Sequence, residues 1–268
     1  MALVLAIANQ KGGVGKTTTA VNVAASLAAA ERSVLLVDLD PQGNASSGVG
    51  VTRDRLDGPT LYHALVGEVP ARAAIRATEL PQLAILPSDA DLVGAELELV
   101  GAEEREKRLR EALAPVRADY EFVLIDCPPS LGLLTLNALV AADRVLVPLQ
   151  CEYYALEGLG SLLRTIDLVR KNLNRELALE GVVLTMFDAR NNLARQVMGD
   201  VQANLPGQVY STVIPRNVRL SEAPSHGRPA LLYDVESKGA QSYLALAQEL
   251  LRRCASGAAL HERQRARP

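Results

Sequence analysis

Glycines and lysines gather in one short segment near the start of the chain, and their spacing is typical of phosphate binding. The segment reads Lys11-Gly12-Gly13-Val14-Gly15-Lys16-Thr17-Thr18. Glycines lack a Cβ atom, so successive backbone N–H groups can turn towards one anion at close range. Lys16 then supplies positive charge to the β- and γ-phosphates, and the hydroxyl of Thr17 is a ligand for Mg²⁺. We therefore expect these eight residues to bind the phosphates of ATP or ADP.

The sequence around this loop places it between a strand and a helix. Apolar residues 3–8 precede the loop, and an alanine-rich run, residues 19–30, follows it. A strand, a glycine-rich turn and a helix N-terminus in this order form a phosphate site. The loop departs from the usual pattern because Gln10 stands where a glycine is expected, and a second lysine, Lys11, begins it. The residue types therefore predict a phosphate loop with an additional cation.

Two further apolar runs of strand length end in carboxylates. Residues 34–38 end at Asp38, with Asp40 in the Pro/Gly turn that follows, and residues 122–126 end at Asp126. Carboxyl ends of parallel strands meet at one edge of a sheet, so these side chains should lie beside the phosphate loop. We expect Asp40 to orient the attacking water and Asp38 to lie next to it, near the metal. The predicted ligands of Mg²⁺ are Thr17, Asp40 and Asp126.

Apolar runs alternate with helical patterns along the whole chain. The runs lack polar alternation, as expected of strands that are covered on both faces. The sequence therefore predicts an α/β fold with a doubly wound, mainly parallel sheet and helices on both faces. The expected strands are residues 3–8, 34–38, 83–86, 122–126, 145–148, 182–186 and 209–214. The expected helices are residues 17–30, 91–114, 131–141, 156–173, 194–204 and 238–256.

The length of 268 residues is enough for one large domain with a substantial core, which we expect to span residues 1–256. Residues 257–268 end the apolar pattern and are expected to form a flexible, weakly basic tail. No apolar run is long enough to span a bilayer, and no basic signal region precedes the first strand, so we expect a cytoplasmic protein without membrane binding. Cys127, Cys151 and Cys254 lack metal-ligand spacing and are expected to be reduced thiols.

The overall charge of the chain does not favour binding to polyanions. The formal net charge is −3, so any contact with nucleic acid must come from a local patch of basic residues. The chain has no Trp and only two Phe and seven Tyr, which leaves few aromatic faces for stacking single-stranded bases. Contacts with the phosphates of a duplex are the more plausible mode.

Five segments together resemble the chromosomal ParA/Soj-type partitioning ATPases, which are phosphate-loop NTPases of the MinD/ParA superfamily. The lysine-glycine loop matches the deviant Walker A form K-G-G-x-G-K-[ST], in which a lysine begins the loop. The resemblance runs from about residue 3 to residue 254. Cys127 and Cys151 stand where members have alanine, or a small residue or proline, and neither departure affects a catalytic group. The matching segments are residues 11–18, 38–44, 126–130, 150–158 and 214–225.

The resemblance implies an ATP hydrolase with weak basal activity that binds ATP or ADP with Mg²⁺. It also implies an ATP-dependent homodimer in which Lys11 of each subunit reaches the nucleotide of the other, so Lys11 joins Lys16 and Asp40 as a catalytic residue. Pro215 and Asn217 match the positions that surround the adenine in this family. A proline ring can form an apolar wall for a base, and an amide can supply hydrogen bonds.

The resemblance further implies that the ATP dimer binds double-stranded DNA without sequence preference and drives segregation of a chromosome or plasmid. Arg190 and Arg219 match the DNA-contact arginines of the family. Arginine–phosphate contacts do not read sequence and weaken with salt, and a dimer doubles their number on one surface. A ParB/Spo0J-type centromere-binding partner is expected to stimulate hydrolysis, with the protein on the nucleoid. Further basic residues that could extend this surface are Arg195, Arg216, Arg228 and Lys238.

Three other functions share parts of this pattern. An ATP-gated regulator would use nucleotide occupancy as its signal, with turnover incidental. A MinD-like positioning ATPase would need a C-terminal amphipathic helix for membrane binding, and residues 257–264 offer only a few apolar positions. A nitrogenase-reductase-like iron–sulfur dimer would need two cysteine ligands in each subunit, and no cysteine precedes Cys127. The partitioning ATPase therefore remains the favoured interpretation.

Overall fold

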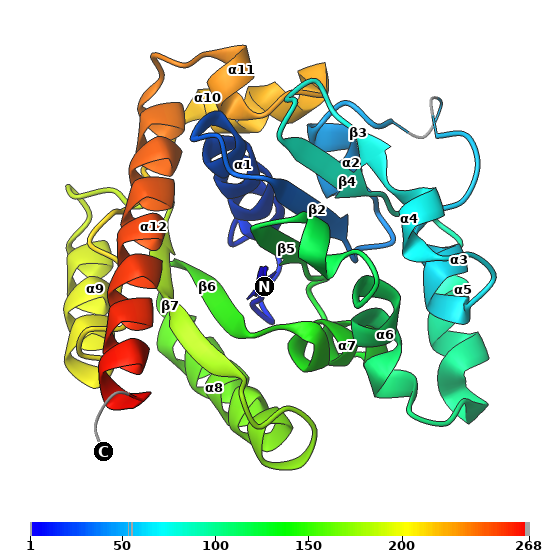
Figure 1. Cartoon of the computed structure of the whole chain (residues 1–268). Helices are drawn as coiled ribbons and strands as arrows, with labels where there is room; N and C mark the ends of the chain where they lie inside the picture. Colours follow the sequence, from blue (N-terminus) through cyan, green and yellow to red (C-terminus); the bar gives the residue numbers. More distant parts are fainter. Residues whose placement is uncertain (1, 53, 55, 266–268) are drawn as a thin grey trace.

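The computed structural model describes residues 2–52, 54 and 56–265, and this part of the chain forms one seven-stranded sheet with helices on both faces (Figure 1). The strand order is β3-β4-β2-β5-β1-β6-β7, and every neighbouring pair is parallel except β3 with β4. The predicted doubly wound α/β fold is confirmed. The strands are β1 (Leu3–Ile7), β2 (Val34–Asp38), β3 (Arg76–Ala77), β4 (Leu83–Leu86), β5 (Phe122–Asp126), β6 (Arg144–Gln150) and β7 (Ala178–Thr185).

Two hydrophobic clusters lie on opposite faces of the sheet, because alternate side chains of each strand point to opposite sides. In β1, Leu5 and Ile7 belong to one cluster, and Val4 and Ala6 belong to the other. Both faces of the sheet are buried under helices, which explains why the strand sequences are continuous apolar runs. Helix α12 lies alongside α1 on the first face (Figure 1).

The helices divide between these two faces. The face that contains Leu5 is covered by α1 (Lys16–Ala29), α2 (Asn44–Gly48), α10 (Val218–Glu222), α11 (Ala230–Tyr233) and α12 (Lys238–Arg265). The other face is covered by α3 (Leu61–Val66), α4 (Ala71–Ala74), α5 (Leu92–Glu98), α6 (Arg108–Leu113), α7 (Leu133–Ala141), α8 (Ala155–Asn172) and α9 (Asn192–Asn204). Short 3₁₀ turns occur at Leu99–Gly101, Arg105–Lys107, Arg117–Asp119 and Ala223–His226.

The long helix predicted over residues 91–114 is wrong, because the chain breaks it between α5 and α6. Ala102 is extended, and Glu104 adopts the left-handed conformation with a φ of 51°. The buried side chain of Asn137 fixes the new course of the chain. Its Nδ2 donates to the carbonyl of Arg105 at 2.9 Å, and its Oδ1 accepts from the N–H of Leu109 at 3.0 Å. The mixed charges of this region resemble those of a solvent-exposed helix, so the sequence pattern does not show where the helix is interrupted.

The strand predicted over residues 209–214 is also wrong. This segment runs beside β7 but forms only isolated bridges, one of which pairs Val209 with Val182. The N–H groups of Ser211 and Thr212 each donate to the carboxylate of Glu249 at 2.9 Å, so they are not available to a ladder. The carboxylate of Glu249 in α12 therefore interrupts the ladder between the hydrogen bonds that Tyr210 and Ile214 donate to β7.

Several predicted boundaries shift. Helix α12 continues to Arg265, well past the expected end at residue 256, and β3 and the short helices α2, α3, α4, α10 and α11 were not expected. The division into a domain over residues 1–256 and a flexible tail over 257–268 stays a prediction, and residues 266–268 lie outside the described part. Within the described residues, no helix is both long and apolar enough to cross a membrane.

Candidate nucleotide-binding site

The predicted phosphate loop joins β1 to α1 at the carboxyl edge of the sheet. Gly13 and Gly15 have φ angles of 74° and 85°, in the left-handed region that L side chains rarely adopt. Gly15 is also the N-cap of α1, so its turn aims the free N–H groups of the helix at the loop. These two glycines are therefore required by the backbone as well as by the space that an anion needs.

Side chains from the neighbouring strands hold this loop in place. Asn9 is buried, its Nδ2 donates to the carbonyl of Pro148 at 2.8 Å, and its Oδ1 accepts from the N–H of Lys11 at 3.0 Å. The hydroxyl of Thr185, at the end of β7, donates to the carbonyl of Val14 at 2.8 Å. Sequence reasoning missed Asn9 and Thr185, because each acts through a contact with a distant part of the chain.

Lys16 lies at the first position of α1 with its side chain folded back over the loop. Its Nζ donates to the carbonyl of Lys11 at 3.1 Å, and the residue is only 7% exposed. Burial lowers the pKa of this ammonium, and the nearby carboxylates of Asp126 and Asp40 partly offset that effect. A buried cation with a backbone carbonyl as its hydrogen-bond partner is poised for a stronger anionic partner.

An open cavity of about 390 Å³ lies over the loop. Its walls come from the loop, from the turn after β2 and from the segment after β5, which are the three places where the sequence predicted chemistry. Asp40 is half-buried in this wall, and its Oδ1 accepts from the N–H of Gln42 at 3.0 Å. The lining residues are Gly12, Gly13, Gly15, Lys16, Thr17, Thr18, Asp40, Gln42, Asn44, Pro129 and Met186.

Asp38 does not line this cavity, and neither does Asp126, beside which Asp38 lies in the pairing of β2 with β5, so its expected place near the metal stays a prediction. Its carboxylate is fully buried and accepts from both the N–H and the hydroxyl of Ser46 at 2.7 Å, and from the N–H of Asp40 at 3.2 Å. Burial raises the pKa of Asp38 to about 6, against these hydrogen bonds. Asp38 therefore fixes the turn that carries Asp40, and Ser46 is a positioning residue that the sequence pattern did not reveal.

Asp126 is the one fully buried carboxylate that has no hydrogen-bond partner among the described residues. Burial raises its pKa well above the usual value, Asp38 raises it further, and Lys16 and the hydroxyl of Thr17 partly offset the rise. Two unpartnered carboxylate oxygens beside a threonine hydroxyl are oxygen donors of the kind that Mg²⁺ prefers. The residues present thus fit the predicted magnesium site.

The proposed magnesium site has few protein ligands. In the described part of the chain, no cluster of three or more His, Cys, Asp or Glu side chains is arranged to hold a metal by itself. Magnesium in phosphate-loop enzymes is held by one or two protein groups together with phosphates and water. Cys127 next to Asp126 is buried, and burial raises the pKa of its thiol.

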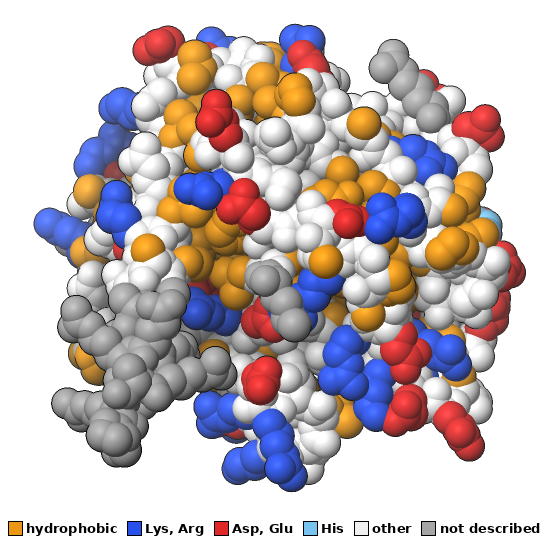
Figure 2. Space-filling model, viewed as in Figure 1, with side chains coloured by type: hydrophobic (Ala, Val, Ile, Leu, Met, Phe, Trp, Pro, Cys, Tyr) orange, Lys and Arg blue, Asp and Glu red, His pale blue; other side chains and the backbone are white. Residues whose placement is uncertain are grey.

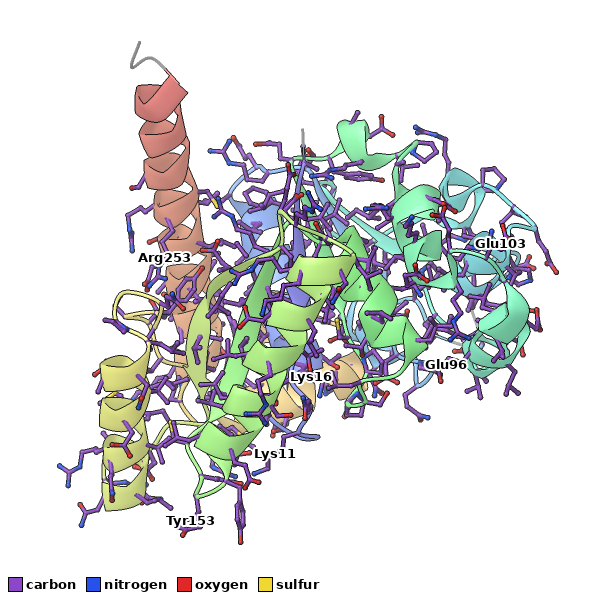
Figure 3. The ribbon with its side chains drawn as sticks, turned by 90° about the horizontal axis from the view of Figure 1, so that it is seen from below. Lys11, Lys16, Glu96, Glu103, Tyr153 and Arg253 are labelled. Carbon is purple, nitrogen blue, oxygen red and sulfur yellow. The ribbon has the colours of Figure 1, made fainter. Side chains whose placement is uncertain are left out.

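Lys11 points away from the cavity over its own loop. Its ammonium forms an ion pair with Glu152, in the turn before α8, and both side chains are partly exposed. Figure 3 shows Lys11 and Tyr153 at the same end of the molecule, where Tyr153 projects outwards. Tyr153 and Tyr154 are 75% and 66% exposed, which is unusual for side chains of this size. The additional lysine of the loop thus lies on an accessible surface.

A second cavity, of about 110 Å³, adjoins the loop on the side of α12. Pro215 and Asn217 both line it, together with Gly15 and Thr18, so the structure brings these predicted adenine residues to the phosphate loop. Asn217 also caps α10, because its Oδ1 accepts from the N–H of Arg219 at 3.0 Å. This arrangement fits a base held beside the phosphates.

Of the two predicted DNA-contact arginines, Arg190 lies in the loop between β7 and α9, and Arg219 lies in α10, which follows the segment beside β7. The N–H of Phe187 donates to the carbonyl of Ile214 at 3.0 Å, which places this loop and that segment side by side. Arg190 is exposed and forms a bidentate pair with Asp188, and its hydrogen bonds lower the pKa of that carboxyl to about 2. Arg219 pairs with Glu222 at 2.8 Å and with Asp234 at 3.1 Å.

The other basic residues that could extend the DNA-binding surface differ from one another in their contacts. Arg228 forms an ion pair with Glu79 at 3.1 Å. Arg195 contacts the side chain of Asn192 on its own helix. Arg216 lies near enough to Asp188 to lower the pKa of its carboxyl. Of these residues, Arg216 extends the surface of Arg190 most directly.

Comparison with known proteins identifies the family of the chain. Residues 2–179 match the family described as "AAA domain". The chain is 59% identical over 250 residues to the chromosome partitioning protein ParA of Myxococcus xanthus, with 93% of this chain and 88% of that protein covered. It is 55% identical over 250 residues to the sporulation initiation inhibitor protein Soj of Bacillus subtilis, with 93% and 98% covered.

Solved structures agree with this fold. A cobyrinic acid a,c-diamide synthase from Mycobacterium smegmatis with bound ADP and magnesium is similar with a TM-score of 0.83 and 43% identity, covering 96% of this chain and 97% of that one. The resemblance inferred from the sequence motifs is confirmed over almost the whole length by the curated relatives. The chain therefore belongs to the ParA/Soj family of chromosome partitioning proteins.

Proposed function

We propose that this protein is an ATP hydrolase whose ATP-bound dimer binds DNA and drives the segregation of a chromosome or plasmid. The observation that carries the proposal is the placement of the two lysines of one phosphate loop. Lys16 lies buried over its own cavity, and Lys11 lies on an exposed surface beside it. One cation can thus serve the nucleotide of its own subunit while the other serves a partner's nucleotide.

The chemistry of hydrolysis follows from the groups around the cavity. The loop N–H groups and Lys16 bind and orient the phosphates, and Asp40 accepts a hydrogen bond from the attacking water. Thr17, Asp126 and Asp40 would hold Mg²⁺, which supplies charge neutralisation on the phosphates when bound. The ADP and magnesium in the similar Mycobacterium smegmatis structure support this choice of ligands.

Dimerisation follows from the position of Lys11. In a single chain, its ammonium is held by Glu152, and an exposed ion pair of this kind contributes about 1 kcal/mol or less. A triphosphate carries several negative charges, so it competes easily for the same cation. ATP in one subunit would then bind Lys11 of the other, whereas ADP lacks the γ-phosphate that makes the contact.

DNA binding depends on the surface that carries Arg190 and Arg219. Both arginines are paired with carboxylates in the single chain, so each must exchange a carboxylate for a phosphate. Each subunit has a net charge of −3, so DNA binding depends on this local surface, and two copies side by side double its contacts with phosphates. A ParB/Spo0J-type partner would stimulate hydrolysis. The loss of ATP would then dissociate the dimer and release the protein from the DNA of the nucleoid.

The dimer is tested with Lys11→Ala. We expect the variant to bind ATP but to remain a monomer, because the phosphate cradle is intact and only the crossing cation is lost. Sedimentation with ATP, with ADP and without nucleotide measures this, and Lys171→Ala, an exposed lysine on α8, is the matched control. An undiminished ATP-dependent dimer of Lys11→Ala would refute the role of this residue across the interface.

DNA binding is tested with Arg219→Glu. The variant should lose affinity for duplex DNA and show a smaller dependence of log affinity on log salt, while ATP binding persists. Arg72→Glu is the control, because Arg72 is an exposed arginine that also pairs with a carboxylate, that of Asp119. Equal retention of both variants on DNA would remove Arg219 from the interface.

A further inference from the structure

Backbone geometry singles out Met186, the residue that directly follows β7. Its φ angle is 50°, in the left-handed region that residues with long side chains rarely adopt. Strain of this kind persists only where the surrounding structure holds it, and strained residues gather at binding sites. On the face that Figure 2 shows, by contrast, basic and acidic side chains are interspersed, so the surface charge there does not favour a ligand of either sign. Met186 is therefore the clearest indication of a further ligand contact.

The other strained positions differ from Met186 in their surroundings. Among the described non-glycine residues, Glu31 and Glu104 also have positive φ angles, of 60° and 51°, and both are exposed. Met186 is partly buried, and it lines two cavities. A glycine would adopt a left-handed conformation without strain. The methionine at this position thus indicates a use for the side chain itself.

Hydrogen bonds on both sides of Met186 hold its backbone in place. The hydroxyl of Thr185 donates to the carbonyl of Val14 in the phosphate loop at 2.8 Å. The N–H of Phe187 donates to the carbonyl of Ile214, in the segment beside β7, at 3.0 Å. The two neighbours of Met186 are thus tied to different segments, and Met186 lies between these two attachments.

The side chain of Met186 lies at the junction of the two cavities. One is the cavity of about 390 Å³ over the phosphate loop, and the other is the cavity of about 110 Å³ that Pro215 and Asn217 line. In the described part of the chain, the residues that line both are Gly15, Thr18 and Met186, of which Met186 has the largest side chain. Its Cε lies 3.9 Å from the position that a Cβ of Gly15 would take, so the methyl group packs over the phosphate loop.

The covalent structure of a nucleotide decides what crosses this junction. This inference rests on the proposed function, which places the phosphates over the loop and the base beside Pro215 and Asn217. The ribose joins these two parts, so it must pass Met186. A thioether chain is flexible and polarisable, so it adapts to an irregular surface such as the carbon face of a sugar. We propose that Met186 binds the ribose of the nucleotide, and that its strained backbone is retained because it points the side chain across the junction.

The test compares two ligands, Mg-ADP and Mg-pyrophosphate, on the variant Met186→Ala. Pyrophosphate carries the phosphates of ADP without its sugar and base. We expect the Kd of Mg-ADP to rise about tenfold, as for the loss of a buried apolar contact, and the Kd of Mg-pyrophosphate to stay unchanged. Titration calorimetry measures both. Met198→Ala is the matched control and should change neither Kd, because Met198 on α9 is also partly buried but packs against the core.

A second pair of variants tests the strain. Met186→Gly and Met186→Ala both lack the long side chain, so both should bind Mg-ADP weakly. Glycine costs stability relative to alanine at most positions, but it relieves strain at a positive φ. The nucleotide-free Met186→Gly protein should therefore melt at a higher temperature than Met186→Ala. Met186→Leu keeps most of the volume of the side chain and should bind Mg-ADP like the wild type.

The outcomes of these measurements separate the ribose contact from the proposed function. An equal rise of both Kd values in Met186→Ala would overturn the ribose contact, because Met186 would then support the phosphate loop. An unchanged Kd of Mg-ADP would overturn it as well. A melting temperature of Met186→Gly below that of Met186→Ala would refute the strain. A wild-type protein that binds Mg-ADP but does not hydrolyse ATP would refute the ATPase and leave the ribose contact intact.

Discussion

The two edges of the sheet bury charged groups in opposite ways. At the amino edge, Glu180 accepts from Arg144 at 2.6 Å and from the hydroxyl of Tyr210 at 2.9 Å, and Glu249 accepts four hydrogen bonds from Ser211 and Thr212. Figure 3 places Arg253 of this network far from Lys11 and Lys16. At the carboxyl edge, Asp126 has no partner among the described residues, and burial depresses the pKa of Lys16.

This difference between the two edges indicates that the amino edge contributes to stability and the carboxyl edge to function. Buried polar groups in native proteins are almost always satisfied, since an unsatisfied group costs free energy. The amino edge follows that rule and ties α12 to the sheet. The carboxyl edge breaks the rule at the residues where phosphates and a metal are expected. Ser26 Oγ and Arg108 Nε are also without a partner among the described residues, but Asp126 is the one such carboxylate, and its place next to the phosphate loop indicates the binding site.

The largest effect should come from Lys16→Met, which keeps the aliphatic stem and removes the charge. We expect ATP hydrolysis to fall by about a hundredfold or more, as for loss of a charge-stabilising group in an active site. The free energy of unfolding of the nucleotide-free protein should not fall, because burial disfavours this ammonium. Phosphate release and urea denaturation measure the two effects. A large loss of stability would contradict the separation of the two edges.

Glu180→Ala should show the opposite behaviour. Removing this buried carboxylate leaves the guanidinium of Arg144 and the hydroxyl of Tyr210 without their partner. We expect the free energy of unfolding to fall by about 3 kcal/mol, as for a broken buried ion pair. Hydrolysis by the folded protein should be unchanged. Denaturation and initial rates below the transition measure this, and a variant that is stable but inactive would place function at the amino edge.

The free energy of unfolding at acidic pH should depend on the protonation of Glu249. Burial alone raises its pKa, but hydrogen bonds from Ser211 and Thr212 outweigh that effect and lower the pKa to about 2. The folded state then binds a proton less readily than the unfolded chain, so this stabilisation is complete above pH 4.5 and is lost as pH falls towards 2. Glu249→Gln should lose stability near neutral pH and vary less between pH 4.5 and 2. Parallel curves for the two proteins would show that Glu249 does not contribute.

The smallest effect should come from Glu152→Gln. The ion pair between Lys11 and Glu152 is partly exposed, so stability should change by about 1 kcal/mol or less. Release of Lys11 should strengthen the ATP-dependent dimer by up to about fivefold, the equivalent of that free energy. Sedimentation across a concentration series measures the dimer constant. A weaker dimer would mean that Glu152 belongs to the interface rather than holding Lys11 back.

Local pattern was enough to predict most of the fold. Six of the seven expected strands form, because a strand covered on both faces leaves an apolar run that few other structures produce. The failures have a common cause in distant side chains. Glu249 takes the N–H groups that a strand at residues 209–214 would use, and Asn137 binds the backbone on both sides of the break near Glu104.

The candidate site divides in the same way. The loop from Lys11 to Thr18, Asp40 and Asp126 could be predicted, since each follows a strand directly and carries a residue type with defined chemistry. Asn9, Ser46 and Glu152 could not, because their roles come from contacts with residues far away in the sequence or from the direction of a side chain. Asp38 lies beside Asp126 in the sheet, and its burial against Ser46 gives it a positioning role that the sequence did not reveal.

The central claim is that a triphosphate joins two copies of this chain through Lys11. The most direct test is the mass in solution of Asp40→Ala, a variant expected to bind ATP without hydrolysing it, measured by light scattering with saturating Mg-ATP and with Mg-ADP. We predict a dimer with ATP and a monomer with ADP. A monomer in saturating Mg-ATP would contradict the account.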